Sequence, residues 1–117
     1  MKTIVFSAPI VPGKSDDARR VGKEIMGARR KAMSESRRAL GQSRETAWIQ
    51  ASPMGDILVV YLEGQDSVRA NREFAASTGP FDRWFKDQAG AINGIDYNEP
   101  CPKGPLRCCW NGRTRAR

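Results

Sequence analysis

Six consecutive residues, Ile57–Leu62, are apolar at both odd and even positions, and no other stretch constrains the fold as strongly. A β-strand points successive side chains to opposite faces, so a strand of this kind has to be covered on both sides. A second strand-like run, Glu45–Ser52, precedes it, and a Pro-Met-Gly-Asp turn joins the two. The pattern predicts an antiparallel hairpin with two apolar faces.

Alternation assigns different side chains to the two faces of this hairpin. Leu58, Val60 and Leu62 share one face with the small aliphatic residues of the preceding strand, which suits packing under helices. The opposite face combines aromatic and polar side chains: Trp48, Gln50, Tyr61 and Glu63. A mixed face of this kind suits an interface or a partly wet cavity.

The segments before the hairpin predict a strand and then a helix. Thr3–Val11 is rich in β-branched and aromatic residues and predicts a first strand, in which Pro9 indicates an edge position or a bulge. From Asp16 to about Leu40, small and apolar residues recur at steps of three and four, which predicts one long helix. Gly41 is placed to end that helix.

A second helical region follows the hairpin in two pieces. Asp66–Ser77 and Pro80–Ile92 both carry apolar residues at helical spacing. Gly79 and Pro80 break the helix between them, and Gly94 ends the second piece. Further along, Leu106–Trp110 is strand-like enough to add a fourth strand.

These elements give the order strand, helix, strand, strand, broken helix and a final short strand. This is the ferredoxin-like β-α-β-β-α-(β) arrangement of an α+β protein with an antiparallel sheet. We predict one such domain over residues 1–110, followed by a disordered basic tail over 111–117. Helices on one face leave the other face of the sheet bare, and a second copy packed against it would cover it. We therefore expect a homodimer, with the final strand pairing either within its own chain or with the partner.

The topology and the two-sided hairpin resemble the dimeric α/β-barrel superfamily, which includes antibiotic-biosynthesis-monooxygenase-like proteins. More narrowly, Gly79–Asp96 (GPFDRWFKDQAGAINGID) and the early Pro12-Gly13-Lys14 before a long helix look like a group of small bacterial barrel proteins of unknown function. The resemblance covers about residues 3–97 and implies a homodimer with a cavity between sheet and helices. Its motifs are specific to fold rather than to chemistry.

The absence of histidine is the most decisive negative feature of the sequence. It excludes Ser-His-Asp and Cys-His catalysis and histidine general bases. The haem-degrading branch of the superfamily ligates haem through histidine, so that branch is not expected either. The three cysteines, Cys101, Cys108 and Cys109, include no C-x-x-C pair and form no disulfide framework. We expect no metal and no cofactor, and the role of the adjacent pair stays open.

Composition favours a single globular domain. The chain has 117 residues, 39% of them hydrophobic and 28% charged. No apolar run reaches the roughly 18–20 residues that cross a bilayer. The apolar start is interrupted at Ser7 and Pro9, which does not fit a signal peptide. We expect a cytoplasmic protein that does not enter membranes.

Two functional hypotheses concern a ligand cavity. The first is a barrel dimer that binds a small, partly apolar molecule without catalysis. The second is a cofactor-independent monooxygenase-like enzyme or isomerase acting on an aromatic or polyketide-like compound. The candidate side chains are Trp48, Gln50, Tyr61, Glu63, Asn71, Asp82 and Trp84. Each has a structural alternative, since Trp84 suits the core, Trp48 and Tyr61 suit a dimer interface, and Asp82 suits helix capping or an ion pair.

A third hypothesis rests on charge. The net charge is +7, and ten basic against four acidic residues lie between Lys14 and Arg44. This basic face could bind nucleic acid or an acidic partner, although a solvated face is the commoner outcome. It requires that the arginines do not pair internally with Glu24, Glu35 or Glu45. The candidates are Arg19, Arg20, Lys23, Arg30, Lys31, Arg37 and Arg38.

Overall fold

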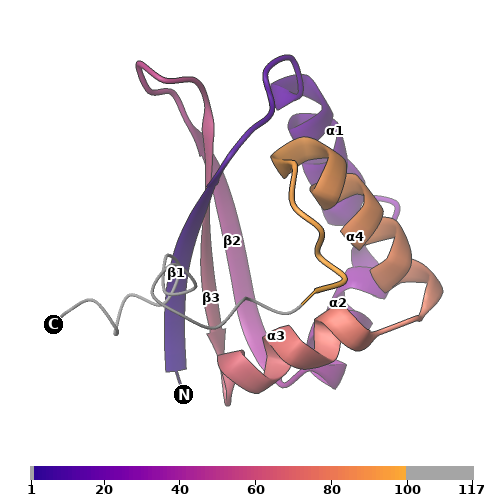
Figure 1. Ribbon diagram of the computed structural model, residues 1–117. Coiled ribbons are helices and arrows are strands. Elements are labelled where there is room, and N and C mark those ends of the chain that lie inside the picture. The colour runs from indigo at the N-terminus through magenta and orange to yellow at the C-terminus, as the bar shows by residue number, and fades with distance from the viewer. Residues whose placement is uncertain (1, 100–117) are drawn as a thin grey trace, which may run out of the picture.

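A computed structural model describes residues 2–99 of the chain, which form a three-stranded antiparallel sheet and four helices (Figure 1). The elements are β1 (Lys2–Pro9), α1 (Ser15–Met26), α2 (Arg30–Ala39), β2 (Gln42–Gln50), β3 (Ile57–Gly64), α3 (Ser67–Ala76) and α4 (Pro80–Asn93). The strand order is β1-β3-β2. This is the predicted mixed α+β class, and it is compatible with a ferredoxin-like arrangement. The predicted final strand, the tail and the cysteines lie outside the described residues.

The helices lie together on one side of the sheet (Figure 1). On that side, Val60 of the central strand β3 is buried, and it stands opposite Phe6 of β1 and Ala47 of β2. Ile4 and Ala8 of β1 are buried on the same face. The faces of the predicted hairpin are therefore confirmed, because the even-numbered residues of β3 turn toward the helices.

The centre of the core joins the end of β1 to two helices. Ile10, Val21 and Ile92 are buried together, and half-buried Trp84 and Phe85 of α4 pack against them. The amide of Val11 donates to the carbonyl oxygen of Ile92 at 2.8 Å, which holds the chain after β1 against the end of α4. Side chains therefore fill this part of the space between sheet and helices.

The predicted single helix over Asp16–Leu40 is wrong, since the structure divides it into α1 and α2. Gly27 follows α1 with φ −118° and ψ −103°, which is outside the helical region. The amide of Arg29 then donates to the carbonyl oxygen of Glu24 at 2.7 Å, a wider turn than an α-helix makes. The turn shifts the buried side of the chain. Ala28 is consequently exposed, whereas Arg37 turns inward.

The predicted break at Gly79 and Pro80 is confirmed. α3 ends at Ala76, and Pro80 begins α4 at a position where its missing amide hydrogen costs little. Gly94 ends α4 with φ +68°, and its amide donates to the carbonyl oxygen of Gly90. Over residues 2–99, the helices are too short or too polar to cross a lipid bilayer.

Candidate functional site

The sheet face opposite the helices carries a line of apolar side chains. Trp48 of β2 stands opposite Val59 of β3, and Tyr61 of β3 stands opposite Val5 of β1. Trp48 is 53% exposed and Val5 47% exposed. Alternation places Ile57 on this face as well. We call this surface the open sheet face: Val5, Trp48, Ile57, Val59 and Tyr61, with the polar residues beside them.

The polar residues of the open sheet face gather mainly at one end. Glu63 stands opposite Arg44 of β2, and the hydroxyl of Tyr61 donates to the Glu63 carboxylate. Gln50 lies at the other end, where it stands opposite Ile57. Four of the seven cavity candidates, Trp48, Gln50, Tyr61 and Glu63, are thus brought together on one surface.

The other three candidates lie in the helix layer, on the far side of the sheet. Asn71 is half-buried on α3. Asp82 of α4 accepts hydrogen bonds at 2.5 Å from the hydroxyls of Ser36 and Ser77. Trp84 packs against neighbouring aromatic rings, and the Arg29 guanidinium lies 3.9 Å from its ring centroid. The sheet separates these three from the first four, so the seven do not share one site.

A largely buried ion pair beneath α2 joins one of the predicted basic-face residues to Glu45. Arg37 Nε donates to Glu45 Oε1 at 2.8 Å, with side chains only 13% and 18% exposed. The guanidinium also lies 4.8 Å from the ring centroid of Phe74 and 5.1 Å from that of Phe85. Arg37 is therefore a structural residue. Its predicted place on the exposed basic face was wrong, because its side chain turns inward.

Lys86 is a feature that sequence reasoning missed. This lysine is 3% exposed, and its Nζ donates to the carbonyl oxygens of Ala75 at 2.9 Å and Ser77 at 2.7 Å. Those carbonyls end α3, where a cation is favoured by the helix dipole. The one available signal was its position beside the aromatic stripe of α4, where a lysine can cover apolar surface with its stem.

The basic-face candidates divide into two groups. Arg19 pairs with Asp16 at 2.9 Å, and Arg20 pairs with Glu24 at 2.8 Å. The remaining four are exposed, and within residues 2–99 they have no carboxylate oxygen in salt-bridge range: Lys23, Arg30, Lys31 and Arg38. Arg20 and Arg37 thus pair internally with Glu24 and Glu45, so the condition set for the basic face fails for these two arginines and is met by the four exposed cations.

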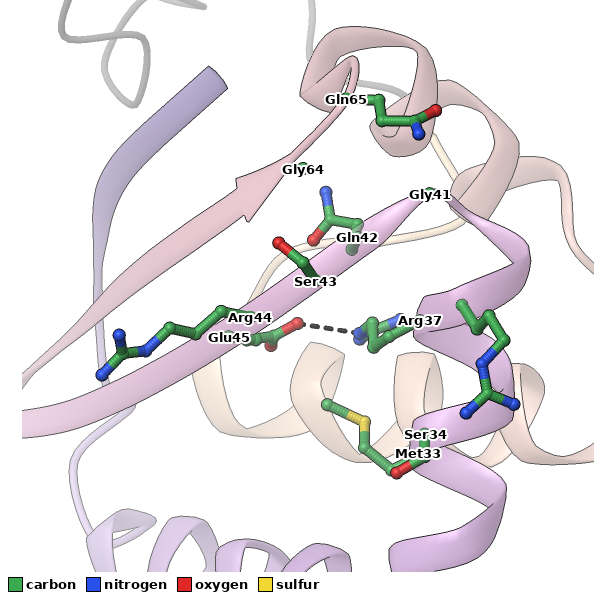
Figure 2. Close-up of a pocket in the computed structure, with 11 residues that line it drawn as sticks. Met33, Ser34, Arg37, Gly41, Gln42, Ser43, Arg44, Glu45, Gly64 and Gln65 are labelled. Carbon is green, nitrogen blue, oxygen red and sulfur yellow. Dashed lines mark hydrogen bonds and ion pairs between the residues drawn. The ribbon is translucent and has the colours of Figure 1, made fainter. Parts of the chain in front are cut away.

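Open hollows mark the surface of residues 2–99, among them the following two. One, of about 710 Å³, lies between α2 and the start of β2, and Arg38, Gln42 and Arg44 are among its lining residues (Figure 2). The other, of about 640 Å³, lies between the loop after β1 and the hairpin turn, and Ser15 Oγ donates to Asp56 Oδ2 at 2.6 Å in its wall. None of the seven cavity candidates lines either hollow.

The open sheet face offers apolar contact and hydrogen-bonding groups. In the chain from residue 2 to residue 99, no three His, Cys, Asp or Glu side chains lie close enough to hold a metal ion. The charged groups of the open sheet face, Arg44 and Glu63, lie at a surface rather than in an enclosed cavity.

Comparison with known proteins identifies no relative: no protein-family model, no curated protein and no solved structure matches the chain. The resemblance of the topology, the hairpin and Gly79–Asp96 to dimeric α/β-barrel proteins therefore remains an expectation based on sequence.

Proposed function

We propose that the protein acts as a homodimer, in which two copies join through the open sheet face, and that it binds a small, partly apolar molecule at this junction. One observation carries the proposal. Trp48 and Val5 lie exposed on the edge strands β2 and β1, beside the apolar side chains of the central strand β3. A monomer rarely leaves such a surface uncovered. Two sheets packed in this way would form a dimeric α/β barrel.

The size of the surface sets the expected strength of the dimer. Strands of eight or nine residues are about 27 Å long, and three of them span about 14 Å, which gives roughly 400 Å² of flat area per copy. Stable interfaces bury about 800 Å² per partner. We therefore expect a reversible dimer whose population rises with concentration.

The ligand is proposed at the junction rather than between sheet and helices. Ile10, Val21 and Ile92 pack together in the latter space. At the junction, the indole of Trp48 offers apolar contact, and Tyr61 with Glu63 offers hydrogen bonds. We favour a binding protein without catalysis over a cofactor-independent oxygenase or isomerase. The reason is that the described residues do not place an acid/base pair in an enclosed cavity. A cytoplasmic location belongs to the same proposal.

Light scattering over a hundredfold range of protein concentration tests the dimer. The full chain should approach twice the monomer mass, whereas Trp48→Glu and Val59→Lys should stay monomeric. Met54→Glu is the matched control, because Met54 is 96% exposed at the hairpin turn. A wild-type chain that is monomeric throughout, or a control that dissociates equally, would contradict the proposal.

The ligand is tested separately with the apolar dye anilinonaphthalene sulfonate. Its fluorescence should rise with the wild-type chain and the Met54→Glu control, and much less with Tyr61→Ala. An equal response from all three would remove the ligand from the proposal and leave the dimer standing.

A further inference from the structure

The cations of residues 14–44 are neutralised unevenly along the chain. On and just before α1, Lys14 lies 3.7 Å from Asp17, Arg19 lies 2.9 Å from Asp16, and Arg20 is paired as described. These three positive charges therefore each have a carboxylate beside them. Lys23 of the same helix has none in salt-bridge range within residues 2–99.

On α2 the balance is different. Lys31 and Arg38 are seven residues, or about two helical turns, apart and share one side of the helix, and Arg30 lies next to that side. All three are exposed. Glu35 is the one acidic residue of the helix, and it forms no ion pair with them within the described chain. Arg37 is turned inward to Glu45, but three cations against one carboxylate still leave the outer surface of α2 with a surplus of positive charge.

Arg38 also lines the hollow beside α2. Arg44 is among the lining residues too, but it stands opposite Glu63 on the open sheet face, and Figure 2 shows its side chain pointing away from the Arg37–Glu45 pair, so it does not belong with the cations of α2. Ser34 and Gln42 also line the hollow. Hydroxyl, amide and guanidinium groups are the side chains that hydrogen-bond phosphate oxygens in nucleic-acid complexes. We call the three exposed cations of α2 the α2 basic patch: Arg30, Lys31 and Arg38.

We infer that the α2 basic patch binds the sugar–phosphate backbone of a nucleic acid. Among the described residues that line the hollow none is aromatic, so they offer bases nothing to stack on, and binding is independent of base sequence. An anionic membrane fits less well, since Met33 is the one large apolar side chain of that described lining and a helix lying on a membrane needs an exposed apolar side. This inference is independent of the sheet-face proposal.

The test is fluorescence anisotropy with a labelled single-stranded oligonucleotide and a labelled duplex of mixed sequence at low salt. The triple variant Arg30→Gln, Lys31→Gln, Arg38→Gln should bind at least tenfold more weakly than wild type. The matched control Lys14→Gln, Arg19→Gln, Arg20→Gln removes the same charge from paired positions and should change affinity less than twofold. Five further basic residues lie at Lys103, Arg107, Arg113, Arg115 and Arg117, and they are the same in all three proteins.

Salt dependence gives a second measurement. If the three substituted residues each contact one phosphate, the slope of log affinity against log salt should become less steep in the triple variant by about 2–3. Equal weakening of triple variant and control would show that overall charge decides binding, and would overturn the inference. So would a wild-type chain that fails to bind either oligonucleotide at low salt.

Two further measurements complete the test. Vesicles of phosphatidylcholine and phosphatidylserine should compete poorly with the oligonucleotide. If the triple variant lost vesicle binding that the wild type and the control keep, while its oligonucleotide binding stayed unchanged, the patch would be a membrane surface. That result would overturn the inference. Light scattering should give the triple variant the wild-type mass, because α2 lies on the far side of the sheet from the proposed junction. A dimer without oligonucleotide binding would refute this inference alone.

Discussion

Arg37 Nε donates to Glu45 Oε1 at 2.8 Å, and this bond ties α2 to the edge strand β2 on the helix-covered side of the sheet. Arg37 Nη1 also donates to Ser36 Oγ at 3.2 Å, and Ser36 donates in turn to Asp82 of α4. A chain of polar side chains therefore links β2, α2 and α4. It explains why a helix with no fully buried residue is held in place.

Breaking the Arg37–Glu45 pair should destabilise the fold. We expect Arg37→Met to lower the free energy of unfolding by about 3 kcal/mol, because it leaves the Glu45 carboxylate mostly buried without its cation. The double variant Arg37→Met, Glu45→Met should lose less than the sum of the single losses. Urea denaturation of the four proteins measures this coupling. Strictly additive losses would show that the pair contributes nothing beyond its separate side chains.

Asp82 should prove to be structural. Asp82→Ala leaves the hydroxyls of Ser36 and Ser77 without their acceptor and should cost about 1–3 kcal/mol of unfolding free energy. Asp87→Ala, at an exposed position of the same helix, should change it by less than about 0.5 kcal/mol. Dye binding should be the same in both variants. Loss of dye binding by folded Asp82→Ala would return Asp82 to the ligand site.

Tyr97 should make stability depend on pH in the alkaline range. Burial raises the pKa of its hydroxyl from 10.0 to about 12, so the folded state holds the proton that the unfolded state loses first. The contribution is complete below pH 10 and is lost as the pH rises toward 12. Urea denaturation should therefore show the stability of the wild type falling relative to Tyr97→Phe across this range. A constant difference between the two would contradict the raised pKa.

Two glycines should respond to alanine in opposite directions. Gly94 has φ +68°, and an added Cβ would lie 3.3 Å from Val11 Cγ2, so Gly94→Ala should cost about 1 kcal/mol or more. Gly22 lies inside α1 with no atom within 4 Å of an added Cβ. Gly22→Ala should stabilise the protein by about 0.5–1 kcal/mol through helix propensity. Thermal unfolding measures both, and a stabilising Gly94→Ala would contradict the left-handed cap.

Local patterns were sufficient for much of the fold. The two faces of the β2–β3 hairpin follow from alternation, and the break between α3 and α4 follows from Gly79 and Pro80. The break at Gly27 escaped prediction because small and apolar residues continue across it at helical spacing, and an isolated glycine is often tolerated in a helix. That break also changed which residues of α2 face inward.

For the candidate site, the sequence by itself determined which side chains share a strand face, because that depends only on neighbouring positions in one strand. Trp48, Gln50, Tyr61 and Glu63 were grouped correctly on this ground. Only the tertiary structure decided which polar side chains of separate elements are paired, since the Arg37–Glu45 and Ser36–Asp82 contacts require those elements to approach within hydrogen-bond distance. Charge can be counted from sequence. Whether a charge is buried and paired depends on the packing of several elements at once, as Arg37 and Lys86 both show.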